Sequence, residues 1–130
     1  MDKIEVVLPM SLEMGVRKKK NVYLNLNVYR NMPFHQNNTL KRLFKAEVEP
    51  ILPDFYFENF RIEYVIYLPN KLKRDIMNVG SIVDKFFCDS LVELGKVPDD
   101  NYNYLKKVSF SFGGLSDDKK GYLVATIIEE

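Results

Sequence analysis

The stretch FRIEYVIYLPNKLKRDIMNVGSIVDKFFCDSLVEL, residues 60–94, decides the fold of this chain. Residues 60–68 place their apolar side chains alternately on one face, which is the pattern of a strand, and Pro69 ends that strand. The basic turn NKLKR then leads into a helix over about residues 76–94, for which Gly95 is the expected C-cap. The rest of the fold is predicted outward from this unit of strand, turn and helix.

Short elements flank this unit on both sides. Residues 31–38 have the composition of a loop, after which Thr39 caps a helix that runs to about Val48. The turn GGLSDDKKG indicates a hairpin between the last two strands. The expected order is ββαβαββ, so we predict one α+β domain over residues 1–130, with two helices on a small mixed sheet. Four runs rich in apolar residues predict the other strands, at residues 3–9, 22–29, 104–112 and 122–128.

The composition excludes several classes of protein. With 19 Lys and Arg against 18 Asp and Glu, the formal net charge of the 130 residues is +1, which excludes a histone-like polycation. The single cysteine, Cys88, excludes an internal disulfide and a multi-cysteine zinc site, and the single histidine, His35, argues against His-rich zinc chemistry. No apolar run is long enough to span a membrane, and the charged N-terminus does not resemble a signal peptide. We therefore expect a protein of the reducing cytoplasm.

The predicted helix over residues 76–94 is amphipathic. At about 100° per residue, Met77, Ser81, Asp84 and Cys88 fall on the side opposite the broad apolar face. This geometry puts Asp84 on the polar side of the helix. The apolar face comprises Ile76, Val79, Val83, Phe86, Phe87, Leu91 and Leu94.

Asp75, Asp84 and the Asp99–Asp100 pair are the candidate chemical groups. Mg²⁺ prefers oxygen ligands and keeps several waters, so two or three converging carboxylates can hold it. The ion then polarises a scissile phosphate and lowers the pKa of the attacking water. Each carboxylate also has a structural interpretation: a helix cap for Asp75, a solvated side chain for Asp84 and a turn for the aspartate pair.

Basic residues gather in three clusters. Lys73 and Arg74 directly precede Asp75, so charges that suit a phosphate lie next to a possible metal ligand. The alternative is that the clusters form solvated loops and an exposed helix face. The clusters are Arg17, Lys18, Lys19 and Lys20; Lys41, Arg42 and Lys45; and Lys71, Lys73 and Arg74.

The stretches KRDIMN, KFFCDSLVELG and VPDDNY resemble the RusA family of phage-type Holliday-junction resolvases. Arg74, Asp75 and Asn78 match the first motif of that family, in which a strand ends in a basic turn followed by acidic residues. The helix and the exit loop match at Lys85, Asp89, Leu91, Gly95, Asp99 and Asp100. The specific motifs are confined to residues 73–101, and the first half of the chain matches only in its order of elements.

The resemblance implies a homodimeric, Mg²⁺-dependent endonuclease that nicks four-way DNA junctions in recombination and repair. Since the sequence has no Gly-rich phosphate loop and no long apolar run, we expect no nucleotide cofactor and no membrane partner. Asp75, Asp99 and Asp100 are the implied metal-site carboxylates, and Lys85 is the implied catalytic lysine. The expected contacts to the DNA backbone are Arg17, Lys18, Lys19, Lys20, Lys71, Lys73 and Arg74.

The chain departs from the family pattern at two points. Met77 replaces the second aspartate of the first motif, and the spacing from Asn78 to Lys85 is about four residues longer. Because four residues are about one helical turn, Asp84 shares the azimuth of Met77 but lies about 10 Å further along the axis. We hypothesise that Asp84 takes over the missing role in a shifted site, with Asp75, Asp84 and Asp100 as ligands.

Two other functions stay open at this point. A branched-DNA-binding module that has lost its metal site would explain Met77. A small structural or interaction protein would fit the composition but not the order of the motifs. Mg²⁺-dependent cleavage of a junction distinguishes the nuclease from both.

Overall fold

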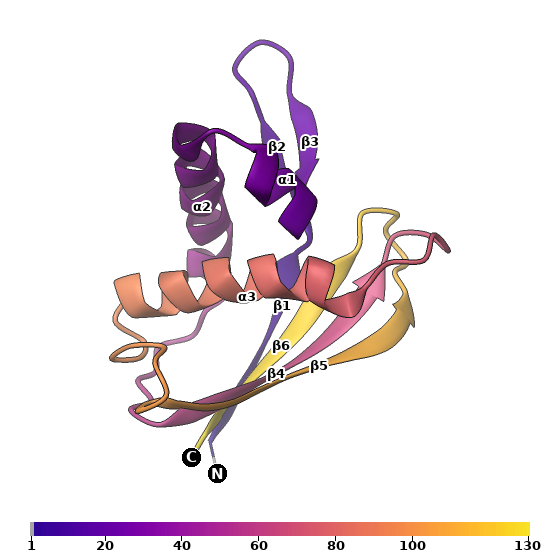
Figure 1. The fold of residues 1–130 in the computed structure, drawn as a ribbon. Coiled ribbons are helices and arrows are strands. Elements are labelled where there is room, and N and C mark those ends of the chain that lie inside the picture. Colours follow the sequence, from indigo (N-terminus) through magenta and orange to yellow (C-terminus); the bar gives the residue numbers. More distant parts are fainter. Residues whose placement is uncertain (1) are drawn as a thin grey trace.

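Four strands form one mixed sheet, in the order β1 (Lys3–Pro9), β6 (Tyr122–Glu129), β4 (Phe60–Leu68) and β5 (Leu105–Leu115). In this computed structural model, which describes residues 2–130, β6 pairs antiparallel with both β1 and β4, while β4 and β5 are parallel. The helices lie on one side of this sheet, and both chain ends lie at the same end of it (Figure 1). The predicted α+β domain with a small mixed sheet is confirmed.

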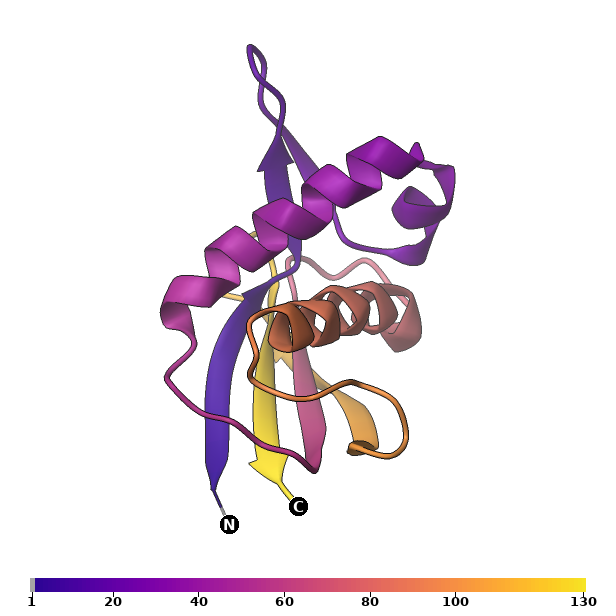
Figure 2. The ribbon, with the colours of Figure 1, turned by 90° about the vertical axis from the view of Figure 1, so that its left-hand side faces the viewer.

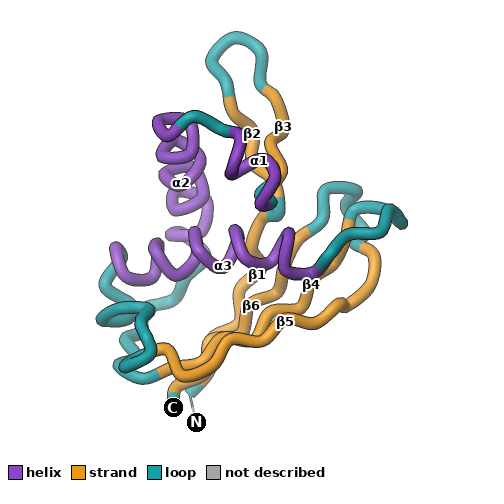
Figure 3. Tube along the Cα trace, in the orientation of Figure 1, coloured by secondary structure: helices purple, strands orange, loops and turns teal. Residues whose placement is uncertain are grey.

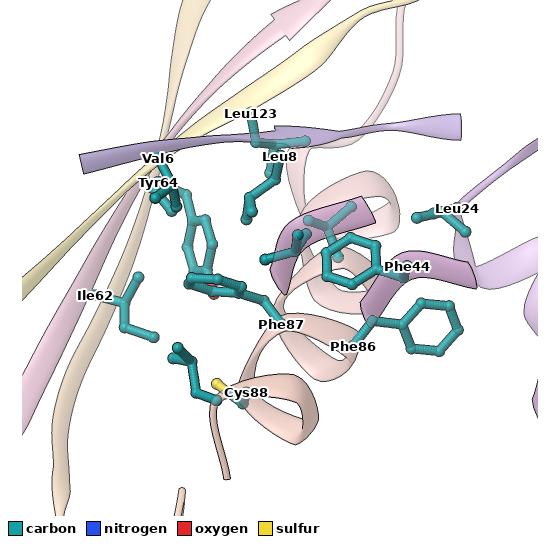
Figure 4. Close-up of a cluster of buried hydrophobic side chains, with 14 of the residues drawn as sticks. Val6, Leu8, Leu24, Phe44, Ile62, Tyr64, Phe86, Phe87, Cys88 and Leu123 are labelled. Atoms are coloured by element: carbon teal, nitrogen blue, oxygen red, sulfur yellow. The ribbon is translucent and has the colours of Figure 1, made fainter. Parts of the chain in front are cut away.

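The alternation in residues 60–68 produces the buried face of β4, as predicted. Phe60, Ile62, Tyr64 and Ile66 are each at most 1% exposed, while Glu63 between them faces solvent. The helix α3 (Ile76–Glu93) covers this face and supplies Phe86 and Phe87 to the core (Figure 4). Strand and helix therefore bury each other's apolar face, which makes the unit the centre of the core.

The end of α3 also follows the prediction. Gly95 adopts a left-handed φ of 72°, a conformation that glycine reaches without steric cost. Its N–H donates to Val92 O at 3.1 Å, and Lys96 N–H donates to Leu91 O at 2.9 Å. These two bonds form a Schellman motif, which satisfies the last carbonyls of the helix.

The first half of the chain differs from the prediction. The expected strand over residues 22–29 is the short strand β3 (Lys20–Tyr23) followed by the helix α1 (Leu26–Asn31). Asn25 explains the change, because its side chain caps α1 by accepting a 2.9 Å hydrogen bond from Val28 N. β3 pairs with the unpredicted strand β2 (Ser11–Met14) in a separate hairpin that projects from the body (Figure 1).

The following helix starts earlier than predicted. α2 (Phe34–Val48) begins directly after Pro33, so most of the expected loop over residues 31–38 is helical. Thr39 is no cap, since its hydroxyl donates back to His35 O within the helix at 3.0 Å. A short 3₁₀ helix, η1 (Glu49–Ile51), extends α2. α2 crosses above the body beside the hairpin (Figure 2).

The predicted hairpin of the last two strands is wrong. β4 lies between β5 and β6, so these two strands are not paired with each other. β5 instead returns parallel to β4 after α3 has crossed the sheet, as a parallel pair requires. The observed order within residues 2–130 is βββααβαββ, with three α-helices where two were expected (Figure 3).

None of the helices in the described residues combines the length and apolar character that crossing a membrane demands.

Candidate functional site

Asp84 faces the sheet, which corrects its predicted place on the solvent side of the helix. Its Oδ1 accepts a 2.6 Å hydrogen bond from the Tyr64 hydroxyl of β4 and a 3.4 Å bond from Cys88 Sγ one turn along α3. Cys88 is only 2% exposed. The helical wheel failed here because α3 contacts the sheet on one side and α1 and α2 on another, so more than half of its circumference is covered.

The surroundings of Asp84 change its acidity. Burial raises the pKa of the Asp84 carboxyl, and the hydrogen bonds from Tyr64 and Cys88 oppose that rise only in part. Burial also raises the pKa of Tyr64 and of Cys88 well above their ordinary values, so both keep the protons that they donate. The negative charge of the half-buried Asp84 carboxylate is thus stabilised by hydrogen bonds from Tyr64 and Cys88.

The two carboxylate oxygens of Asp84 differ in their surroundings. Both hydrogen bonds end on Oδ1, and no donor within residues 2–130 reaches Oδ2. Oδ2 is also not among the fully buried polar atoms that lack a partner, so it is not completely shielded from solvent. The hydrogen bonds to Oδ1 therefore orient the Asp84 carboxylate, while Oδ2 is left without a protein donor among the described residues. Hydrogen bonds to one oxygen orient metal-binding carboxylates in the same way.

The loop after α3 brings the charge of Asp100 near Cys88. Burial is the largest cause of the raised pKa of Cys88, and the negative charges of Asp84, Asp100 and Asp89 raise it further. Partial burial raises the pKa of Asp100, and the hydrogen bond that its protonated carboxyl can donate to Asp99 and the charge of Asp89 add to this rise. Acidic groups therefore gather beside the second half of α3, although Asp89 itself is paired with Lys41 of α2 at 3.0 Å.

Asp99 stabilises a turn. Its Oδ1 accepts from the Asp100 N–H at 2.8 Å, and its Oδ2 accepts from Asn101 Nδ2 at 2.9 Å. Both carboxylate oxygens are thus engaged inside the loop, as the turn interpretation of this aspartate pair requires. Asp100 is exposed and is the member of the pair that remains available.

Asp75 lies apart from the other carboxylates. It occupies the N-cap position of α3, is exposed, and makes no capping hydrogen bond with its side chain. Asp84 follows nine residues later, which is about 13 Å along the helix axis at ~1.5 Å per residue. Two carboxylates so separated cannot both contact one Mg²⁺ ion, whose ligands lie at about 2.1 Å.

The predicted metal set is therefore not assembled. Among residues 2–130, no group of three or more His, Cys, Asp or Glu side chains is arranged to hold a metal ion. Asp75, Asp84 and Asp100 thus lie at different points along α3 and its exit loop. The structure therefore does not bring these three carboxylates into one group.

Lys85 follows Asp84 but is exposed on α3, and no carboxylate of the described chain lies within 4.0 Å of its amine. Two lysines of the second basic cluster are engaged elsewhere, since Lys41 pairs with Asp89 and Lys45 pairs with Glu93 at 3.3 Å. The ion pairs of Lys41 and Lys45 join α2 to α3, so these two lysines have a structural role that does not involve DNA.

One residue from each of the other two basic clusters lines a common cavity. Arg17, Lys18 and Lys19 form the exposed turn of the β2–β3 hairpin, and Lys20 begins β3. Lys20 and Arg74 line the same open cavity of about 640 Å³, although 53 positions separate them in the sequence. Lys71 and Lys73 line a neighbouring cavity of about 430 Å³ together with Asp75.

Tyr64 is the residue of this site that the sequence analysis missed. The period-two pattern of residues 60–68 places it only on the apolar face of the strand. A tyrosine among aliphatic residues on a buried face carries a hydroxyl that needs a polar partner. That requirement is the signal that could have placed a buried acceptor such as Asp84 opposite β4.

No known protein-family model matches this chain, and no curated protein is significantly similar to it. The resemblance to RusA-type resolvases therefore remains an expectation from the motifs in residues 73–101.

Proposed function

We propose that this chain is a metal-dependent endonuclease of the RusA type that nicks branched DNA at a site centred on Asp84. The observation that carries the proposal is the Asp84 carboxylate, which Tyr64 and Cys88 hold by one oxygen while the other has no donor among the described residues. A half-buried carboxylate with a raised pKa and no cationic partner costs stability, and such costs are typical of functional sites.

The proposal uses few protein ligands for the metal. Mg²⁺ is commonly held by one or two carboxylates together with substrate phosphates and water. Asp84 and Asp100 are the carboxylates that would hold it, and Asp99 would keep Asp100 in place through the turn. When bound, the ion would polarise the scissile phosphate and lower the pKa of the attacking water.

Cationic side chains take the remaining roles. Lys85, next to Asp84 and free of an ion pair, would balance negative charge that develops on the phosphate. Lys71, Lys73 and Arg74 and the hairpin cluster of Arg17 to Lys20 would hold the DNA backbone. In this proposal, Asp75 belongs to the basic turn and not to the metal site.

A homodimer is part of the proposal, since a four-way junction offers two symmetry-related cleavage points. The candidate surface is the free edge of β5, the outermost strand of the sheet. Phe112 and Leu115 are 56% and 47% exposed there, and they border the same cavity as the exposed Leu72. An exposed apolar edge strand is prone to pair with another chain. Antiparallel pairing with the β5 strand of a second copy would cover this edge.

Cleavage of a synthetic four-way junction tests the proposal. Nicking should appear with Mg²⁺ and disappear with chelator. Asp84→Asn should reduce the rate by at least about a hundredfold, the size expected for losing an electrostatic group at the reacting centre. Asp75→Asn and Asp89→Asn, which remove charges on the same helix, should each reduce it by less than about tenfold. If Asp84→Asn cleaves at the wild-type rate, the proposed site is wrong.

A second function is favoured by one observation, the lack of a three-carboxylate metal cluster within residues 2–130. It is a non-catalytic module that binds branched DNA. In that case wild-type protein would bind the junction at equilibrium but leave it uncut at every Mg²⁺ concentration.

A further inference from the structure

An open cavity of about 640 Å³ lies between the β2–β3 hairpin, α1 and the first turn of α3. Its size falls in the range of small-molecule sites, which is about 300–1,000 Å³. Among the described residues that line it, Lys20 and Arg74 are the charged ones, and both are cations. The cavity is therefore complementary to an anionic group, and it lies away from the carboxylates beside Asp84.

Two asparagines supply oriented hydrogen-bond donors to this cavity. Asn25 Oδ1 accepts from Val28 N at 2.9 Å, and Asn78 Oδ1 accepts from Leu26 N at 3.2 Å. Both oxygens are thereby engaged with the start of α1, while neither amide Nδ2 group donates to a partner within the described residues. Since both side chains line the cavity, these amide groups are available to the acceptor atoms of a ligand.

Apart from the polar residues Asn21 and Gln36, the rest of the wall is apolar and adaptable. Met14, Met32 and Val79 contribute side chains without hydrogen-bond donors, and Tyr23 contributes an aromatic ring. Methionine fits irregular shapes because its side chain is unbranched and polarisable, and tyrosine offers a surface on which a base can stack. One part of the cavity thus suits a planar ring, while the cations and amides suit a phosphate and carbonyl oxygens.

We propose that this cavity binds one unpaired nucleotide of a DNA strand. Its phosphate lies against Lys20 and Arg74, and its base lies between the apolar wall and the two asparagine amides. The inference rests on the proposed function, because base pairs at the crossing point of branched DNA open more easily than those within a duplex and so release an unpaired nucleotide. The exposed basic residues of the hairpin turn and of the turn over residues 71–74 provide the charge along which the strand continues.

Equilibrium binding in chelator tests the proposal without any contribution from cleavage. Two labelled probes are compared by fluorescence anisotropy, a single-stranded dodecamer of thymidine and a duplex of twelve base pairs. Val28 lines the cavity on α1, so Val28→Trp fills it without changing the charge. We expect this variant to bind the single strand at least tenfold more weakly and the duplex within twofold of wild type.

Charge variants give a second route if Val28→Trp does not fold. The double variant Lys20→Gln/Arg74→Gln should weaken binding of the single strand more than binding of the duplex. Lys106→Gln/Lys107→Gln, two exposed lysines of β5 away from the cavity, should affect the two probes equally. A junction with 2-aminopurine at the crossing point should gain fluorescence on binding wild type and not on binding Val28→Trp.

Failure of the cavity proposal and failure of the nuclease proposal give different experimental results. If the cavity variants weaken single strand and duplex alike, or weaken neither, the cavity proposal is overturned while the nuclease proposal stands on its cleavage assay. If wild type binds the single strand selectively but never cuts a junction, the cavity proposal holds and the nuclease proposal fails. If wild type binds no DNA, both are wrong.

Discussion

The phenolic hydroxyl of Tyr64 on β4 donates a 2.6 Å hydrogen bond to Oδ1 of Asp84 on α3. The Tyr64 ring is itself held in the core, stacked on Phe110 of β5 at 5.0 Å with an interplanar angle of 8°. It also meets Phe87 of α3 edge to face at 6.4 Å. A rigid aromatic ring of the sheet thus fixes the position of a half-buried carboxylate on the helix.

Tyr64→Phe should destabilise the protein. The substitution removes a hydrogen bond to a charged acceptor, which is worth about 1.5–3 kcal/mol, and corresponds to a fall of about 5–10 °C in Tm. In an Asp84→Asn background the same substitution should cost only about 1 kcal/mol, because the bond is then between neutral groups. Urea unfolding of the two single variants and the double variant measures this coupling, and strictly additive costs would contradict it.

Asp84→Asn should stabilise the protein at neutral pH. The pKa of Asp84 is raised above its ordinary value of 3.8, so the folded state binds this proton more tightly than the unfolded state. Stability from this group is present below pH about 3.8 and is lost as the pH rises through the folded pKa. At pH 7 the buried charge of Asp84 therefore lowers the free energy of unfolding of the wild type in full. The neutral asparagine variant does not have this charge.

Thermal unfolding at pH 7.5 and at pH 4 measures this effect. The advantage of Asp84→Asn should be a few degrees at pH 7.5 and smaller at pH 4. Asp89→Asn is the matched control, because Asp89 is paired with Lys41 and its loss should lower stability by about 0–1 kcal/mol. A wild type that is more stable than Asp84→Asn at pH 7.5 would show that Asp84 is a structural residue.

Gly80→Ala should destabilise the protein even though alanine favours helices. A Cβ at position 80 would lie 2.6 Å from the Phe110 ring, which the Tyr64 stack holds in place. Overpacking of this kind costs about 1–3 kcal/mol and exceeds the helix-propensity gain of up to about 1 kcal/mol. We expect a net loss of about 1 kcal/mol in urea unfolding.

The neighbouring substitution Ser81→Ala provides the control for Gly80→Ala. Ser81 Oγ is buried without a hydrogen-bond partner in the described structure. Replacing it by alanine removes an unsatisfied polar atom from the same helix, so stability should stay equal or rise. If both alanine variants stabilise the protein, the close contact between α3 and Phe110 is looser than described here.

Cys88 should be unreactive in the folded protein. It is 2% exposed, and burial together with the nearby charge of Asp84 raises its pKa well above 9.0. Because the thiolate is the reactive form, labelling by a disulfide reagent at pH 8 should be at least about a hundredfold slower than in urea. Labelling of the native protein at the unfolded rate would show that the Tyr64–Asp84–Cys88 group is open.

Local signals were sufficient for part of the fold. The period-two pattern of residues 60–68 predicted β4, and the period of residues 76–94 with Gly95 predicted α3 and its end. The predicted strand over residues 22–29 is wrong because Asn25 accepts a hydrogen bond from Val28 N–H and caps α1, although the alternating pattern indicated a strand. Pairing was beyond these signals, since a turn between β5 and β6 does not reveal that β4 is inserted between them.

The sequence by itself determined which chemical groups are present and where along α3 they occur, including the separation of Asp75 from Asp84. The tertiary structure alone decided which of them meet. Asp84 faces Tyr64 because α3 is covered on two sides, and Lys20 lines one cavity with Arg74 because the base of the hairpin and α1 lie next to the first turn of α3. The physical reason is that periodicity reports one preferred face of an element, whereas contact depends on every surface that packs around it.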